Sequence, residues 1–108
     1  MHYFIYKDND LYCEEVRVED IVKDVGSPCY VYSQRTLIEH FRKLKVAFKP
    51  VNPLICYSMK ANSNLAICKA LVNEGAGLDI VSGGELYRAL KVKADPEKIV
   101  FAGVGKTD

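Results

Sequence analysis

Lys60 is the side chain best placed for chemistry, because it directly follows residues 54–59, an apolar run of strand length. Side chains alternate along a strand, so Lys60 shares one face with Cys56 and Ser58. A lysine amine in a partly desolvated pocket loses its proton readily and condenses with an aldehyde such as that of pyridoxal phosphate. A lysine after a strand is, however, most often simply solvated. Both interpretations stay open at this point.

A second candidate, Asp79, lies within the apolar run 78–81. A carboxylate removed from water needs a hydrogen-bond donor or a cation, which either Lys60 or the backbone amides of its own loop would supply. The nearby pattern Ser82-Gly83-Gly84-Glu85 is typical of a capping box at a helix N-terminus, and it favours a structural role for Glu85.

Two other motifs do not support a site. The segment 103–107 ends in Gly-Lys-Thr, but a phosphate loop would need glycine at position 100, where the sequence has Val100. His2 and His40 have no partners at metal-ligand spacing. We therefore expect neither a nucleotide-hydrolysing protein nor a metal centre.

The elements that must position these residues alternate along the chain. Two short strands, 3–6 and 11–16, flank the polar turn 7–10 and predict a hairpin. Helices are expected over residues 19–25, 33–48, 65–74 and 82–92, and strands over 54–59, 78–81 and 99–102. Strands that are apolar on both faces and alternate with helices require a parallel sheet covered by helices. The predicted fold class is α/β.

Ser27-Pro28 marks a change between two regions. Residues 1–28 hold the hairpin and the first helix, and residues 29–108 hold the βα units. Because no helix follows the last predicted strand, we expect the chain to be a truncated part of a longer protein.

Composition narrows the function classes. The 108 residues are 49% hydrophobic, which suits one packed domain. The 15 basic and 14 acidic residues leave a net charge of +1, too little to attract nucleic acid or a membrane surface. No segment reaches the roughly 20 apolar residues of a membrane span. The 4 cysteines form no C-x-x-C pair, which favours reduced thiols and a cytoplasmic location.

Three blocks carry a resemblance to a known family. They are residues 57–64 (YSMKANSN), 75–86 (GAGLDIVSGGEL) and 98–107 (KIVFAGVGKT), and residues 26–32 (GSPCYVY) are similar to the start of that family's barrel. In this order the blocks resemble the diaminopimelate decarboxylases, a branch of the barrel decarboxylases that depend on pyridoxal phosphate. Ser58 departs from the alanine more usual in the family, which would place a hydroxyl near the lysine.

The resemblance implies a pyridoxal-phosphate-binding (β/α)₈ TIM barrel of the alanine-racemase type, with residues 1–28 belonging to a second, β-rich domain. Lys60 would bond covalently to the cofactor, as the catalytic residue, and Asp79 would be a cofactor-binding residue beside it. The full-length protein would be a homodimer that decarboxylates a small amino acid, meso-diaminopimelate, to L-lysine in the last step of lysine biosynthesis. Further cofactor and substrate residues would lie beyond residue 108, so the chain alone should be inactive.

Three alternatives remain at this stage. The chain could belong to a related barrel decarboxylase acting on ornithine, arginine or carboxynorspermidine. It could belong to a non-catalytic barrel that binds pyridoxal phosphate. It could also be a plain α/β segment whose Lys60 binds nothing.

Overall fold

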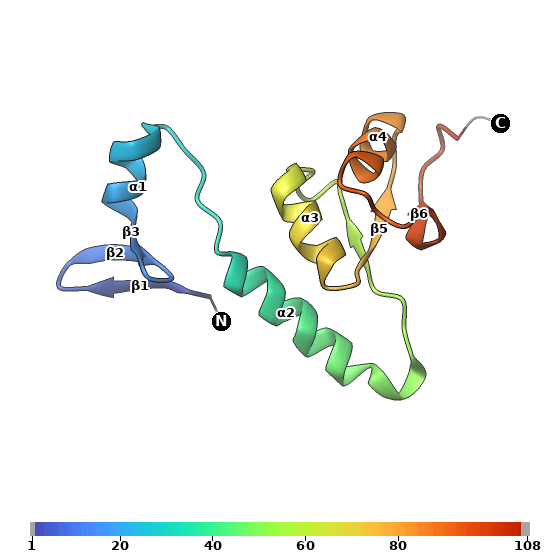
Figure 1. Ribbon diagram of the computed structural model, residues 1–108, viewed down its shortest axis with the longest axis horizontal. Coiled ribbons are helices and arrows are strands. Elements are labelled where there is room, and N and C mark those ends of the chain that lie inside the picture. The colour runs from blue at the N-terminus through green and yellow to red at the C-terminus, as the bar shows by residue number, and fades with distance from the viewer. Residues whose placement is uncertain (1, 107–108) are drawn as a thin grey trace. The chain divides into compact units, whose positions relative to one another are not determined.

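The computed structural model describes residues 2–106, and the chain divides into two compact units, Met1–Glu39 and His40–Asp108. The boundary between the units falls within helix α2 (Gln34–Ala47), which is labelled in Figure 1. Ser33 caps this helix, because its Oγ accepts a hydrogen bond from the Thr36 N–H at 3.0 Å. The expected helix is confirmed. Among the apolar residues of this segment, Phe41 is buried, whereas Leu44 and Phe48 are exposed.

The first unit is built on an antiparallel sheet. β1 (Phe4–Lys7) pairs with β2 (Asp10–Cys13), β2 pairs with β3 (Val16–Arg17), and α1 (Val18–Val25) follows. Asp8 and Asn9 have φ of +50° and +68°, as a two-residue turn between twisted strands requires. The predicted hairpin is confirmed, but the prediction of one strand over 11–16 is wrong at its end. Glu14, with φ of +57°, turns the chain there and separates β2 from β3.

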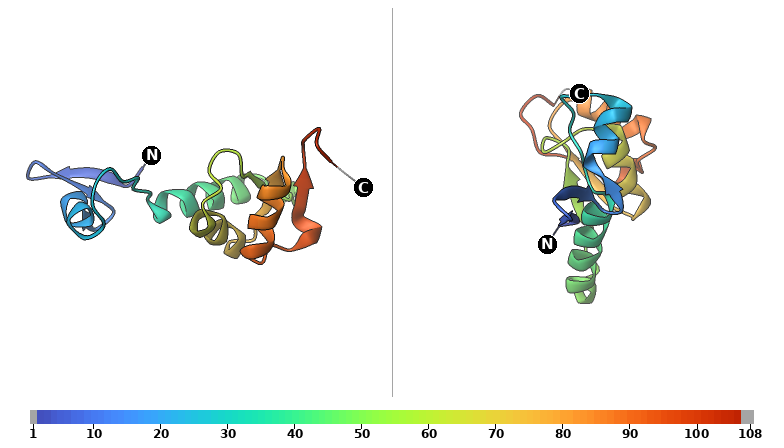
Figure 2. Two further views of the ribbon diagram at one scale, coloured as in Figure 1. Left: turned by 90° about the horizontal axis from the view of Figure 1, so that it is seen from above. Right: turned by 90° about the vertical axis from the view of Figure 1, so that its left-hand side faces the viewer.

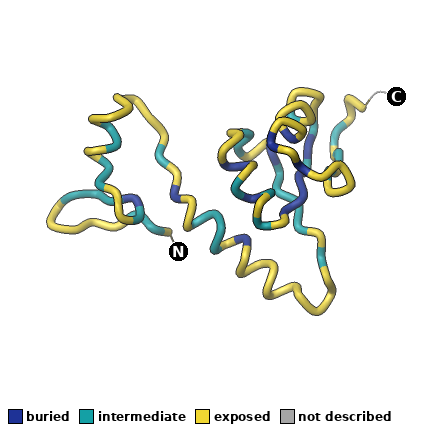
Figure 3. Tube along the Cα trace, in the orientation of Figure 1, coloured by how far each residue is buried: buried dark blue, intermediate teal, exposed yellow. Residues whose placement is uncertain are grey.

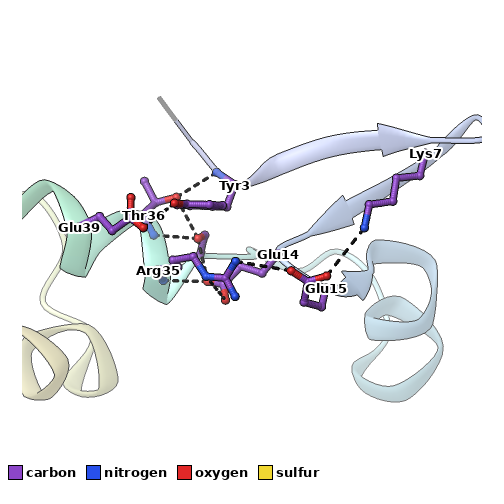
Figure 4. Close-up of polar contacts among 8 residues, drawn as sticks. Tyr3, Lys7, Glu14, Glu15, Arg35, Thr36 and Glu39 are labelled. Atoms are coloured by element: carbon purple, nitrogen blue, oxygen red, sulfur yellow. Dashed lines mark hydrogen bonds and ion pairs between the residues drawn. The ribbon is translucent and has the colours of Figure 1, made fainter.

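Glu14 also ties this turn to the start of α2 within the first unit. Its carboxylate accepts hydrogen bonds from the Arg35 backbone N–H and from the Ser33 hydroxyl, both at 2.8 Å (Figure 4). These two bonds, the amide first and then the hydroxyl, hold the pKa of Glu14 below its ordinary value because they stabilise the charged form.

The second unit is a parallel sheet with helices packed on it. β4 (Cys56–Ser58), β5 (Gly77–Ile80) and β6 (Ile99–Phe101) lie in that order, joined through α3 (Leu65–Asn73) and α4 (Gly83–Lys91). Short 3-10 helices, Lys49–Val51 and Pro96–Lys98, precede β4 and β6. The α/β class and the parallel pairing are confirmed. The predicted strand 54–59 is too long, because only residues 56–58 pair with β5 as a regular ladder.

α3 and α4 lie side by side on the sheet (Figure 2) and bury one of its faces. The core of the unit is Met59, Cys68, Leu78, Ile80, Ala89, Val92 and Ala94. Buried residues gather in these elements in Figure 3. Since Met59 and Leu78 are 0% exposed on the helix side, the alternating residues Ser58 and Asp79 lie on the opposite face of the sheet.

Gly77, at the start of β5, permits a close approach on both sides. A Cβ at this position would lie 2.5 Å from the Lys98 carbonyl oxygen and 2.7 Å from Cys56 Sγ. Real Cβ atoms do not approach other atoms this closely, so any side chain at this position must displace the neighbouring strands.

Acidification is expected to loosen the first unit. Because the folded pKa of Glu14 lies below the unfolded one, its stabilising contribution is complete above the ordinary value of about 4.5 and is lost as pH falls through the lowered pKa. Hydrogen-exchange protection factors of the β1–β2 amides should therefore drop below that pH. Glu14→Gln should reduce protection at pH 7 and flatten the pH dependence. Glu15→Gln, at the exposed neighbouring residue, should retain it, and an equal effect of both variants would contradict the assignment.

Gly77→Ala should lower the free energy of unfolding by about 2 kcal/mol or more, because overpacking between strands forces backbone shifts. Gly84→Ala is the matched control. Its Cβ would meet only Ser82 Oγ at 3.8 Å, and alanine is favoured over glycine in a helix by up to about 1 kcal/mol. Urea denaturation compares the two variants, and a neutral Gly77→Ala would refute the close approach.

Candidate functional site

Lys60 lies two residues after the carboxyl end of β4, in a turn over residues 59–61. The Met59 N–H donates to the Asp79 carbonyl at 2.9 Å, so the pairing with β5 extends to the residue before Lys60. The Ala61 N–H closes the turn by donating to the Ser58 carbonyl at 3.1 Å. Working side chains of parallel α/β proteins lie at this end of the strands. Lys60 is exposed, and its amine has no hydrogen bond or ion pair with residues 2–106.

The loop after Lys60 is anchored on both sides. The Tyr57 hydroxyl donates to the Asn62 carbonyl at 3.0 Å, and the Asn62 side chain accepts from the Asn64 N–H at 3.0 Å. Asn64 in turn caps α3, because its Oδ1 accepts from the Ala66 N–H at 2.9 Å. The backbone that carries Lys60 is thus held between β4 and a capped helix.

Asp79 lies opposite Ser58 on β4 and opposite Val100 on β6, so the three residues form one row across the sheet. Asp79 accepts no hydrogen bond from the described part of its own loop, which was one of its two sequence interpretations. Ser58 Oγ and Asp79 Oδ1 are both buried and have no hydrogen-bond partner among residues 2–106. A buried polar atom left unpaired costs about 1–3 kcal/mol. We therefore expect a further polar group to pair with these two oxygens.

Cys56 lies on the same face, one alternation before Ser58 and opposite Gly77. Burial raises the pKa of its thiol, and the nearby Asp79 carboxylate raises it further. The thiol is therefore protonated at neutral pH and is a poor nucleophile. The four cysteines, all within the described residues, are free of disulfide bonds.

Glu85 occupies the start of α4. Its backbone N–H donates to Ser82 Oγ at 3.2 Å, as the capping box predicts. Its carboxylate accepts from the Val81 N–H at 2.8 Å, one residue before the donor that the motif specifies. The residue thus fixes the junction between β5 and α4.

Other expected features can be placed briefly. Thr107 and Asp108, which end the glycine-rich segment after β6, lie outside the described residues. Between residues 2 and 106 there is no group of three or more histidine, cysteine, aspartate and glutamate side chains that would hold a metal ion. No helix in the same range is long and apolar enough to cross a membrane.

The row of Ser58, Asp79 and Val100 was not evident from the sequence. Alternation along one strand groups Ser58 with Lys60, but the register between strands decides which residues are neighbours across the sheet. An aspartate and a serine in short apolar strands were the available signal.

Comparison with known proteins gives a family match over residues 34–108, described as the pyridoxal binding domain of pyridoxal-dependent decarboxylase. The diaminopimelate decarboxylase of Neisseria meningitidis serogroup B is 48% identical over 98 residues, 91% of this chain and 24% of that protein. The enzyme of Vibrio cholerae is 46% identical over 109 residues, 100% of this chain and 26% of that protein. The chain thus spans about a quarter of the length of these relatives.

Solved structures give the same result. A protein of Aquifex aeolicus superposes with a TM-score of 0.91 at 48% identity, covering 97% of this chain and 26% of that one. The diaminopimelate decarboxylase of M. jannaschii in complex with L-lysine superposes with a TM-score of 0.90 at 34% identity. The match covers 96% of this chain and 25% of that one.

Proposed function

Because this chain belongs to the pyridoxal-dependent decarboxylases, we propose that it is part of a diaminopimelate decarboxylase, which converts meso-diaminopimelate to L-lysine and CO₂. The observation that carries the proposal is the place of Lys60. It lies at the carboxyl end of a parallel strand, on a loop anchored at both ends, within the matched domain.

The residues around Lys60 fit pyridoxal phosphate. The cofactor's aldehyde requires a primary amine, and the Lys60 amine is exposed and unpaired among the described residues. The cofactor's polar groups require polar partners. The sheet face next to Lys60 offers Ser58 Oγ and Asp79 Oδ1, which are buried without a hydrogen-bond partner in the described part of the chain. When bound, the cofactor supplies an electron sink for the pair left behind by the departing carboxylate.

In this proposal Lys60 Nζ holds the cofactor covalently, and Asp79 is the acidic cofactor-binding residue beside it. An amine is also a base, so Lys60 Nζ holds and returns a proton when it is not bonded to the cofactor. The thiol of Cys56, protonated and set back from the strand end, takes no part in this chemistry.

We extend the proposal to the larger protein. The sequential order β4-β5-β6, with helices on one face, supports the first part of a (β/α)₈ TIM barrel. Residues 1–28 would join a β-rich domain, and the protein would act as a homodimer. A small amino-acid substrate is supported by relatives whose structures are complexes with L-lysine. Free cysteines support a reducing, cytoplasmic location.

The cofactor assignment predicts a covalent adduct. The full-length protein, incubated with pyridoxal phosphate and reduced with borohydride, should carry a pyridoxyl group on the peptide that contains Lys60. Lys60→Arg should abolish the adduct, because a guanidinium stays protonated and does not condense. Lys49→Arg, the same exchange at an exposed lysine in the 3-10 helix before β4, should retain it. Mass spectrometry of the digested protein decides, and a wild-type protein without the adduct would end the cofactor proposal.

The substrate assignment predicts CO₂ release from meso-diaminopimelate with formation of L-lysine. Parallel assays use ornithine, arginine and carboxynorspermidine. Release from one of these and not from meso-diaminopimelate would replace the proposed activity with the corresponding rival. The 108 residues alone should release no CO₂, because the phosphate site of such barrels is built from the loops after the last strands. Turnover by the isolated chain would contradict that expectation.

A further inference from the structure

An open hollow of about 440 Å³ lies in the second unit, where α3 meets the C-terminal end of α4. The residues that line it are Leu65, Ala66 and Lys69 of α3, and Lys91, Val92 and Lys93 at the end of α4. The volume is at the small end of the range of about 300–1,000 Å³ that is usual for small-molecule sites. None of these residues has a role in the proposed function.

The charge of this hollow is unbalanced. Three of the described residues that line it are lysines, and none of them is acidic. Within residues 2–106, none of the three lysines forms an ion pair. Acidic side chains of the same unit are engaged elsewhere, since Glu74 pairs with Arg42 and Asp95 pairs with Lys98. The hollow therefore carries positive charge without a lining carboxylate to offset it.

The C-terminal end of α4 balances only part of this charge. Lys69 Nζ donates to the Val92 carbonyl at 3.1 Å, and a cation at this end of a helix is favourable. The helix dipole, however, is equivalent to only about −0.5 elementary charge there, so about 2.5 of the three positive charges remain. Lys91 Nζ lies 5.3 Å from the centroid of the Tyr87 ring, which is a neutral partner.

Lys93 occupies a backbone position that favours glycine. Its φ is +58°, its N–H donates to the Leu90 carbonyl at 2.9 Å, and the Ala94 N–H donates to the Ala89 carbonyl at 3.1 Å. These two bonds form a Schellman motif, in which the left-handed residue is usually glycine. Residues that contradict a local backbone preference gather at functional sites. The position of Lys93 therefore indicates that its side chain has a function.

A phosphate monoester matches the charge and the walls of this hollow. Its phosphate group carries a charge of about −1.5 to −2 at neutral pH, closer to the remaining positive charge than a single carboxylate is. Lysine ammonium groups bind phosphate as point charges with three donors each. The side chains of Leu65, Ala66 and Val92 offer apolar contact to a small organic body.

We propose that the hollow is a binding site for a small phosphate monoester, held by Lys69, Lys91 and Lys93. Lys60 does not line the hollow, so the site is additional to the proposed cofactor site and does not rest on it.

The test measures binding of phenyl phosphate to the full-length protein after removal of unbound pyridoxal phosphate. Lysines are acetylated with a trace of N-hydroxysuccinimide acetate, and mass spectrometry follows each lysine, with exposed Lys49 as internal reference. Phenyl phosphate should protect Lys69, Lys91 and Lys93 in a saturable manner, with a midpoint of about 1 mM or below. Phenol, which lacks the anion, and potassium chloride at the same ionic strength should not protect them. Equal protection by either would overturn the proposal.

Lys93→Gly removes one of the three cations without endangering the fold, because glycine is favoured at this φ. The dissociation constant of phenyl phosphate should rise at least about fivefold, because a charge-assisted hydrogen bond is lost. The melting temperature should not fall. Lys49→Gln, which removes the same charge at an exposed lysine outside the hollow, should leave the dissociation constant unchanged. An unchanged constant in Lys93→Gly, or an equal rise in both variants, would refute the site.

Benzoate distinguishes phosphate from carboxylate as the preferred anion. With a single negative charge on a similar ring, it should protect the three lysines only at concentrations at least about threefold higher than phenyl phosphate, because Coulomb attraction scales with charge. Equal protection at equal concentration would contradict the choice of a phosphate monoester.

Discussion

Burial of one face of the parallel sheet against α3 and α4 determines where the side chains of the site lie. Met59 and Leu78 are wholly enclosed on the helix side, each worth about 1.5–3 kcal/mol for a fully buried side chain of this kind. Because side chains alternate, this burial leaves Ser58 and Asp79 on the other face. A slip of one residue would expose the apolar side chains and bury the polar ones, so the core protects the register of the site.

The loop that carries Lys60 depends on the same construction. β4 fixes its beginning through the pairing with β5, and Asn64 fixes its end as the cap of α3. Tyr57, which packs on the core, also bonds across the loop to Asn62. Orientation of a reacting group lowers the entropic cost of reaction, so a backbone held in this way supports the role that we propose for Lys60.

The face of the sheet that is not covered by α3 and α4 is less well satisfied than the helix side. Two buried oxygens, Ser58 Oγ and Asp79 Oδ1, have no hydrogen-bond partner among residues 2–106, and Val100 beside them is 43% exposed. Folded proteins pair their buried polar groups, so departures gather where a ligand or another chain segment completes the structure. The relatives are about four times longer than this chain.

The amino-acid sequence by itself determined the α/β class, the main helices and strands and the capping box at Ser82, and it indicated Lys60 as the candidate for chemistry. These features depend on periodicity, on turn residues and on local hydrogen bonds, all of which act over a few positions. The turn at Glu14, the short extent of β4 and the Val81 donor to Glu85 required the tertiary structure. So did the juxtaposition of Ser58 with Asp79, which are far apart along the chain. Their proximity follows from strand register, and register is set by long-range packing that no local pattern encodes.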